Sequence, residues 1–241
     1  MSTYSGPASI FSGNPFDVDE ANPSCQLGTL MVTPDGRKYR YVKVGITALV
    51  VGNLLQGPAE DTGDQDLAVA AATAGLNYFT TTSTVTVTAN QYAGGYAAVT
   101  VTPDLGRLYR IKSHPAATSA VVTITLDEPI QTSFTTDTRI DLYANPYNGV
   151  IQNPTAASGP VVGVAVKAIT AGQYGWIQTG GIANILSEAV AVGLGAVAGN
   201  GTPGAVETAV SDSTESQAYV GQAVMASTAG QCGLFKLNIG D

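Results

Sequence analysis

The chain has 241 residues, of which only 12% are charged and 44% are hydrophobic, and its formal net charge is −8 at pH 7. This length fits one large β domain or two small ones, and the many apolar and β-branched residues argue against intrinsic disorder. The acidic balance disfavours general nucleic-acid binding, which needs Lys and Arg to neutralise phosphates, and no apolar run is long enough for a membrane-spanning helix.

The first 54 residues predict an extended segment followed by a hairpin. Residues 1–28 are rich in Ser, Gly, Pro and Asn, which is typical of a disordered tail or of an N-terminal arm that docks on a partner. In residues 29–54, two β-prone runs flank Pro34-Asp35-Gly36, where Pro fixes φ and Gly accepts φ > 0, so we expect a hairpin. The apolar run Ile46 to Val51 predicts a buried strand.

Residues 56–76 predict a short helix, and the chain from residue 80 onwards predicts strands. In the first stretch, acidic residues precede an Ala-rich run that ends at Gly75, as at the ends of a helix. Alternation of Val and Thr then begins, and turn sequences separate the further predicted strands Tyr96–Thr102, Leu108–Lys112, Val121–Leu126 and Arg139–Tyr143. Short strands at this spacing indicate an all-β sandwich or barrel.

The chain contains an approximate copy of one of its own segments. Residues 162–178, VGVAVKAITAGQYGWIQ, recur as residues 220–236, VGQAVMASTAGQCGLFK. Each copy predicts two apolar strands joined by a Thr-Ala-Gly-Gln turn, with Gly172 and Gly230 placed to take φ > 0. Tyr174 and Trp176 fall on the strand face opposite Ile177, so the strand is apolar on both faces. We expect a barrel core on one side and a partner subunit on the other, which makes Trp176 a candidate partner-binding residue.

The predicted fold class is therefore all-β: antiparallel sandwich or barrel modules with an extended N-terminal arm and at most one or two short helices. The turn Asn145-Pro146-Tyr147-Asn148-Gly149 is the best candidate boundary. We expect an N-terminal arm over 1–28, a β-sandwich or barrel region over 29–149, and a C-terminal β-barrel module with the repeated hairpin over 150–241.

The sequence contains no recognisable catalytic, cofactor or metal constellation. His114, the only histidine, precedes a proline at a predicted strand end, so we expect a surface turn residue. Cys25 and Cys232 lie far apart in sequence, which favours free thiols and leaves no local zinc set. Four carboxylates, Glu60, Asp61, Asp64 and Asp66, could hold a cation, but their spacing fits no EF-hand and a solvated loop at a helix start is favoured. We therefore expect no enzyme and no cofactor.

Basic residues are clustered in two predicted hairpins. The first contains Arg37, Lys38, Arg40 and Lys43 interleaved with Tyr39 and Tyr41; the second contains Arg107, Arg110 and Lys112. Three interpretations remain open: a strip that docks on an acidic protein surface, two solvated strand faces, and, least favoured, a surface that stacks on nucleic-acid bases. The candidate partner-binding residues are Arg37, Lys38, Tyr39, Arg40, Tyr41, Lys43 and Trp176.

Several segments resemble head structural proteins of tailed bacteriophages, including capsid decoration, or cement, proteins. The resemblance rests on ANQYAGGYAAVTVTPDLGRLYRIKSHPAA followed by VTITLDEPI, on ANPYNGVI and VGVAVKAITAGQYGWIQTGGIANIL, and on the terminal VGQAVMASTAGQCGLFKLNI, and it covers about residues 25–241.

This resemblance implies a non-enzymatic decoration protein on the virion capsid surface, made in a bacterial host cytoplasm, which is consistent with an N-terminus that lacks a signal-peptide pattern. The implied partners are the major capsid protein and other copies of this chain. A homotrimer is preferred because capsids present threefold axes, and no nucleic acid or membrane is involved. The main alternative is a head-fibre or tail component that binds a host receptor. A β-sandwich carbohydrate-active enzyme is a more distant one.

Overall fold

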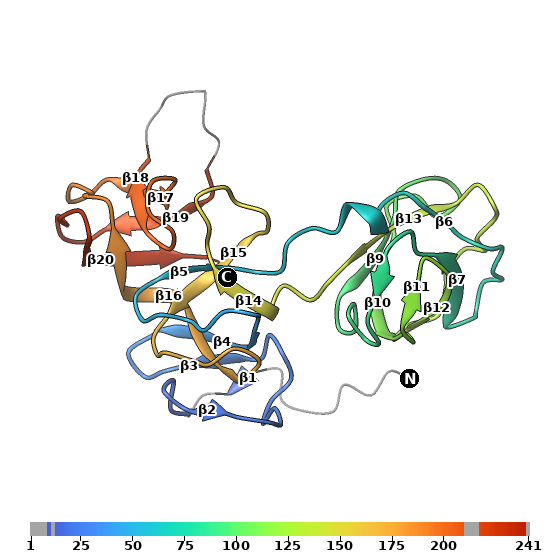
Figure 1. Cartoon of the computed structure of the whole chain (residues 1–241), viewed down its shortest axis with the longest axis horizontal. Helices are drawn as coiled ribbons and strands as arrows, with labels where there is room; N and C mark the ends of the chain where they lie inside the picture. The colour runs from blue at the N-terminus through green and yellow to red at the C-terminus, as the bar shows by residue number, and fades with distance from the viewer. Residues whose placement is uncertain (1–8, 11–12, 210–216, 240–241) are drawn as a thin grey trace. The chain divides into compact units, whose positions relative to one another are not determined.

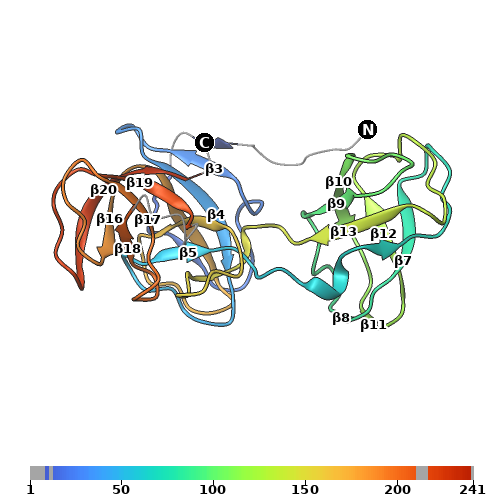
Figure 2. The same ribbon diagram turned by 90° about the horizontal axis from the view of Figure 1, so that it is seen from above.

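The protein, described here as a computed structural model over residues 9–10, 13–209 and 217–239, consists almost entirely of β-strands (Figures 1 and 2). The expected all-β class is confirmed. Among the described residues, no helix is long and apolar enough to cross a bilayer.

The chain forms two compact units whose boundaries differ from the expected ones. One unit is Glu60–Asn145, and the other combines the described residues before Glu60 with those after Asn145. The expected division into 1–28, 29–149 and 150–241 therefore does not match, because residues 29–59 join the C-terminal part. The boundary at Asn145-Pro146 does fall within the turn that the sequence singled out.

The unit Glu60–Asn145 is a nearly closed antiparallel barrel. Its six-stranded sheet has the order β6-β13-β9-β10-β12-β7, and the bridge between Val69 and Thr81 brings the two edge strands together. A separate pair joins β8 to β11. The core contains Phe79, Tyr109 and Phe134, whose rings pack edge to face. The strands are β6 (Leu67–Ala68), β7 (Tyr78–Thr82), β8 (Thr86–Val87), β9 (Tyr96–Val99), β10 (Leu108–Ser113), β11 (Ala117–Thr118), β12 (Val121–Leu126) and β13 (Arg139–Tyr143).

The helix expected within 56–76 is wrong. Only a 3₁₀ turn, η1 (Thr62–Asp64), is present, and β6 follows it directly. Leu67 and Val69 are buried while Ala68 between them is exposed, which is the alternation of a strand. Ala70 N–H donates to the Thr80 carbonyl at 2.9 Å. Pairing to β7 and burial of the two larger side chains outweigh the modest helix preference of the alanines.

In the second unit the strands form two closed rings that share β16 (Tyr174–Ser187). Its twelve-stranded sheet contains β1 (Ser9–Ile10), β2 (Val18–Asp19), β3 (Leu30–Val32), β4 (Lys38–Val44), β5 (Leu54–Gln56), β14 (Asn148–Gln152), β15 (Val161–Ala165), β16, β17 (Gly195–Ala198), β18 (Val206–Thr208), β19 (Tyr219–Ala223) and β20 (Gln231–Asn238). The first ring runs β4-β14-β5-β15-β16 and closes where β16 pairs with β4. The second runs β16-β18-β17-β19-β20 and closes where β20 pairs with β16.

The two rings have the same register, strand for strand. In both rings, the first and third strands in chain order pair in parallel, and all the remaining neighbouring strands pair antiparallel. Each residue pair of the first ring has a counterpart in the second: Val44–Val150 corresponds to Ser187–Val206, Gln56–Ile151 to Val197–Glu207, Leu55–Gly163 to Ala196–Gly221, Val164–Gln178 to Gln222–Lys236, and Lys43–Tyr174 to Leu186–Cys232. The unit is therefore a tandem duplication of a five-stranded ring, and the unit Glu60–Asn145 is inserted between the second and third strands of the first copy.

The repeated segments are β-hairpins at equivalent places in the two rings, as the sequence predicts. The first copy supplies β15 and the start of β16, and the second supplies β19 and β20. Gly172 and Gly230 close their turns at φ values of +80° and +76°, the left-handed region that favours glycine. Val42, Ile177 and Val162 line the interior of the first ring, and Ile185, Phe235 and Val220 line that of the second.

In residues 29–54, which belong to the first ring, one expected element is present and the other is absent. The hairpin around Gly36 is confirmed, because β3 pairs antiparallel with β4. The buried strand expected over Ile46 to Val51 is wrong: this segment is a loop in which Ile46 is 95% exposed and only Leu49 is buried, through a bridge to Ile169. An apolar run alone therefore does not show which of its side chains are buried in a core.

Candidate functional site

The aromatic residues predicted to contact a partner lie inside the protein. Tyr39, Tyr41 and Trp176 are buried together with Met31, on the outer face of the first ring, where β4 runs beside β16. Tyr41 packs edge to face on Trp176 with a centroid distance of 5.1 Å and lies parallel to Tyr174 at 6.2 Å. These side chains are therefore buried within the described chain, and other residues of the same chain cover this face.

An N-terminal cover, residues 13–28, shields this aromatic cluster. Its strand β2 pairs antiparallel with β16 at Tyr174 and Gly175. Ser24 N–H donates to the Tyr41 hydroxyl at 3.1 Å, and Gly28 N–H donates to the Tyr41 carbonyl at 2.8 Å. Cys25 and Leu27 pack against the cluster.

Asp19 ties the cover to β4. Its carboxylate accepts hydrogen bonds from the Ser24 hydroxyl, at 2.6 Å, and from the Tyr41 hydroxyl. These bonds hold the pKa of Asp19 below its ordinary value of 3.8. Burial, followed by the bond to Asp19, raises the pKa of Tyr41 to about 12. The pair therefore remains a carboxylate and a neutral phenol across the physiological pH range.

The basic residues of the same hairpin are engaged within the chain. Arg37 pairs with Asp35 at 2.6 Å, Arg40 donates to the Gly28 carbonyl at 2.8 Å, and the Lys43 ammonium lies 5.8 Å from the centre of the Tyr174 ring. Lys38 is half-buried. The second predicted basic group, Arg107, Arg110 and Lys112, belongs to the other unit, where Arg107 pairs with Asp104 and Arg110 with Asp127. The structure thus places the two basic groups in different units, and the arginines of both groups make contacts within their own unit.

Three of the four acidic side chains of residues 60–66 accept separate hydrogen bonds within the chain, and the fourth residue, Asp66, is held through its backbone. Asp64 is fully buried and accepts hydrogen bonds from the Ser83 hydroxyl at 2.7 Å and the Tyr92 hydroxyl at 2.6 Å. Asp61 caps η1 by accepting from Gly63 N–H, and Glu60 accepts from Gln65. The backbone N–H of Asp66 donates to Asp141. Within the described residues, no three Asp, Glu, His or Cys side chains are grouped so that they could hold a metal ion.

His114 is buried, which corrects the expected surface position. Its Nε2 accepts a hydrogen bond from Tyr92 N–H at 3.0 Å, so the proton lies on Nδ1, which donates to the Pro115 carbonyl at 2.9 Å. Both ring nitrogens are used by the backbone. His114 therefore fixes the loop around Tyr92. Cys25 and Cys232 are free thiols, as expected.

The second ring presents an uncovered apolar face at the positions that the cover shields in the first ring. Leu234 occupies the position of Trp176 and is 37% exposed instead of 5%; Ile182 occupies that of Tyr39 and is 45% exposed instead of 0%. Asn184 occupies the position of Tyr41 and Cys232 that of Tyr174, and Asn184 and Cys232 are both exposed. We call this surface, formed by Ile182, Asn184, Val224, Cys232 and Leu234, the second-ring face.

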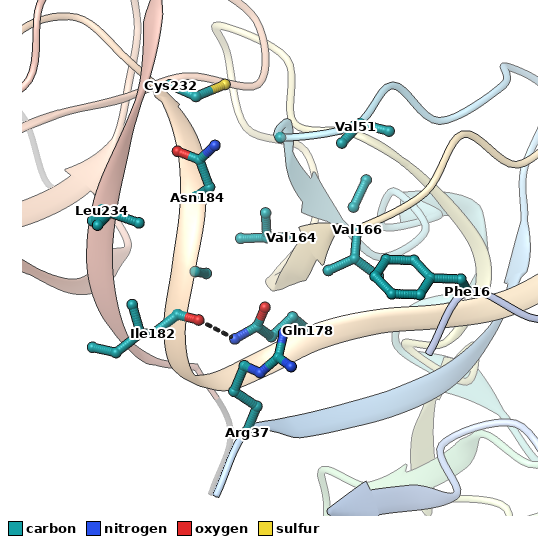
Figure 3. A pocket seen from close by; sticks show the side chains of 13 residues that line it. Phe16, Arg37, Val51, Val164, Val166, Gln178, Ile182, Asn184, Cys232 and Leu234 are labelled. Atoms are coloured by element: carbon teal, nitrogen blue, oxygen red, sulfur yellow. Dashed lines mark hydrogen bonds between the residues drawn. The ribbon is translucent and has the colours of Figure 1, made fainter. Parts of the chain in front are cut away.

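A hollow of about 310 Å³ lies beside the second-ring face. Ile182, Asn184, Cys232 and Leu234 line one side of it, and Phe16, Val51 and Val166 line the other (Figure 3). Gln178 forms its floor and donates to the Ile182 carbonyl at 2.8 Å, where β16 passes from one ring to the next. The hollow is large enough for one or two apolar side chains, and it is continuous with the cover through Phe16.

The sequence signal for this face lies in the positions at which the two repeat copies differ. Identity between the copies marks the turn and part of the ring interiors, whereas two of the differing positions, Trp176 against Leu234 and Tyr174 against Cys232, lie on the outer faces. Comparisons with known proteins add no assignment: no family model, no curated protein and no solved structure matches the chain.

Proposed function

We propose that the chain is a non-enzymatic structural protein of a phage head, a decoration protein that binds the capsid surface and stabilises it. The observation that carries this proposal is the second-ring face, an apolar sheet face that is left uncovered in a unit whose equivalent face is covered. Exposed apolar surface of this kind is typical of interaction sites. The sequence resemblance to phage head proteins supplies the setting.

The organisation of the chain supports binding as its mechanism. Each unit has its own hydrophobic core, so each can hold a binding surface in a fixed shape. Many copies on a symmetric lattice gain avidity, so a modest contact per copy is sufficient. Bound across a joint between major capsid subunits, the chain opposes their separation under internal pressure. Self-association as a trimer on threefold positions belongs to this proposal.

The test is to quantify the chain in purified virions and to compare the heat resistance of complete particles with particles that lack it. We expect a copy number in the hundreds, comparable to that of capsid subunits, and earlier loss of packaged DNA on heating when the chain is absent. A few copies per virion, combined with normal heat resistance and failure to adsorb to cells, would instead identify a head-fibre or tail component that binds a host receptor.

A further inference from the structure

The first ring shows how an outer face of this type is occupied. The cover crosses it as an extended chain, and at β2 it adds a short antiparallel strand to the edge of β16 at Tyr174 and Gly175, beyond the end of β15. The residues of β2 and its neighbours, Phe16-Asp17-Val18-Asp19-Glu20, alternate apolar and acidic side chains. Strand addition of this kind takes affinity from the backbone and specificity from alternate side chains.

The second ring has the same edge, and no described strand lies along it as β2 does in the first ring. Cys232 and Gly233 of β20 are the equivalents of Tyr174 and Gly175, and they extend beyond β19 in the same way. In the described part of the chain, β20 pairs with β16 and β19 alone. The duplication accounts for the difference, because the second ring begins within β16 and has no preceding segment of its own to serve as a cover.

The charge on this surface favours an acidic segment. Lys236 is exposed beside Ile182, and no carboxylate lines the hollow, where Arg37 is already paired with Asp35. Asn184 takes the position of Tyr41, whose hydroxyl donates to Asp19 in the first ring. An amide N–H₂ can make the same donation to an acidic side chain.

We infer that the second-ring face binds an extended segment of another protein chain in which apolar and acidic residues alternate. The segment lies along β20 as a short antiparallel strand at Cys232 and Gly233, places an apolar side chain in the 310 Å³ hollow, and directs a carboxylate towards Asn184 and Lys236. This inference names the partner chemistry for the surface used in the proposed function and rests on that function for its biological setting.

The experiment titrates the full chain with a fluorescent synthetic peptide of the sequence of residues 13–27, with Ser in place of Cys25. We expect saturable binding that weakens at least tenfold in Leu234→Lys and Ile182→Lys and at least threefold when the peptide's three acidic residues are replaced by their amides. Val121→Lys, at an exposed strand position of the other unit, is the matched control and leaves binding unchanged. Circular dichroism and the melting temperature confirm that each variant is folded.

Trp176 emission separates the two faces, because this residue is the only tryptophan and lies under the cover. Binding at the second-ring face leaves its emission unchanged. The inference is overturned by absence of saturable binding, by equal binding to Leu234→Lys, or by a shift in Trp176 emission that signals displacement of the chain's own cover. Dimerisation that Leu234→Lys abolishes also overturns it, since the occupant is then the same face of a second copy.

The outcomes for the inference and for the proposed function are distinguishable. Peptide binding without any effect of the chain on capsid heat resistance supports the inference and contradicts the decoration role. Capsid stabilisation that is unchanged in Leu234→Lys supports the decoration role and contradicts the inference.

Discussion

Trp176 in the first ring and Leu234 in the second occupy the same register position, but the first is 5% exposed and the second 37%. The strand pairings around them are equivalent, and the neighbouring inward-facing residues, Ile177 and Phe235, are both fully buried. The rings therefore differ in what lies on the outer face and agree in the interior. Duplication reproduced the architecture, and the surface composition diverged with its surroundings.

The residues on the outer faces of the two rings differ according to whether the cover lies over them. Where the cover lies, β4 and β16 carry large aromatic side chains, which contribute much buried area and pack well in edge-to-face arrangements. Where it is absent, the positions equivalent to Tyr39, Tyr41 and Trp176 carry the smaller aliphatic or polar residues Ile182, Asn184 and Leu234. The second ring therefore exposes less apolar area on this face than a row of aromatic side chains would, and large exposed apolar patches promote non-specific association.

The largest expected difference between the rings comes from truncating the two equivalent side chains. Trp176→Ala removes a buried ring from the aromatic cluster and should lower the free energy of unfolding by about 3–5 kcal/mol, while Leu234→Ala should lower it by about 1 kcal/mol because 37% of that residue is already exposed to water. Urea denaturation followed by circular dichroism measures both. Losses of similar size would show that the cover contributes no burial.

The turns provide a comparison in which the rings should behave alike. Gly172→Val and Gly230→Val force a β-branched residue into the left-handed region, at +80° and +76°, which costs about 1–3 kcal/mol in each. Gly195→Val, where the backbone carries no such restriction and the nearest atom to an added Cβ is on the exposed Tyr219 ring at 3.2 Å, should cost less. Thermal melts of the three variants test this order; a Gly195 variant as unstable as the other two would contradict it.

The local pattern of the sequence predicts the hairpins but not the rings. Alternation and turn residues locate Val121–Leu126 and Arg139–Tyr143 at their observed bounds, and the internal copy predicts both repeated hairpins. Closure of the first ring depends on the parallel pair β4–β14, whose strands are separated by the whole inserted unit. Nothing in either strand specifies a partner that distant, because pairing depends on a core that forms only when both are present.

The errors at individual residues have the same origin. Tyr39, Tyr41 and Trp176 have the composition of an interface, and they do form one, but with residues 13–28 of their own chain. His114 precedes a proline as a turn residue would, but Tyr92 and Pro115 use both its nitrogens in the interior. The residue types indicate side chains that form contacts, whereas the residues that they contact depend on how distant segments of the chain pack together.

The smallest expected effect concerns the attachment of the cover and its pH dependence. Because the pKa of Asp19 is lower in the folded protein than its ordinary 3.8, its contribution is present above that value and is lost as the pH falls through the folded pKa. Trp176 emission should therefore shift to longer wavelength below about pH 4 as the cover loosens. The partly solvated charged hydrogen bond that is lost contributes about 1 kcal/mol to the attachment of the cover.

Asp19→Asn should show part of this shift already at pH 7 and a weaker acid transition. Glu20→Gln, at the exposed neighbouring position, should behave as the unmodified chain. The same acid profile in both variants would mean that contacts other than the Asp19–Tyr41 bond hold the cover, and that the two rings differ by apolar burial alone.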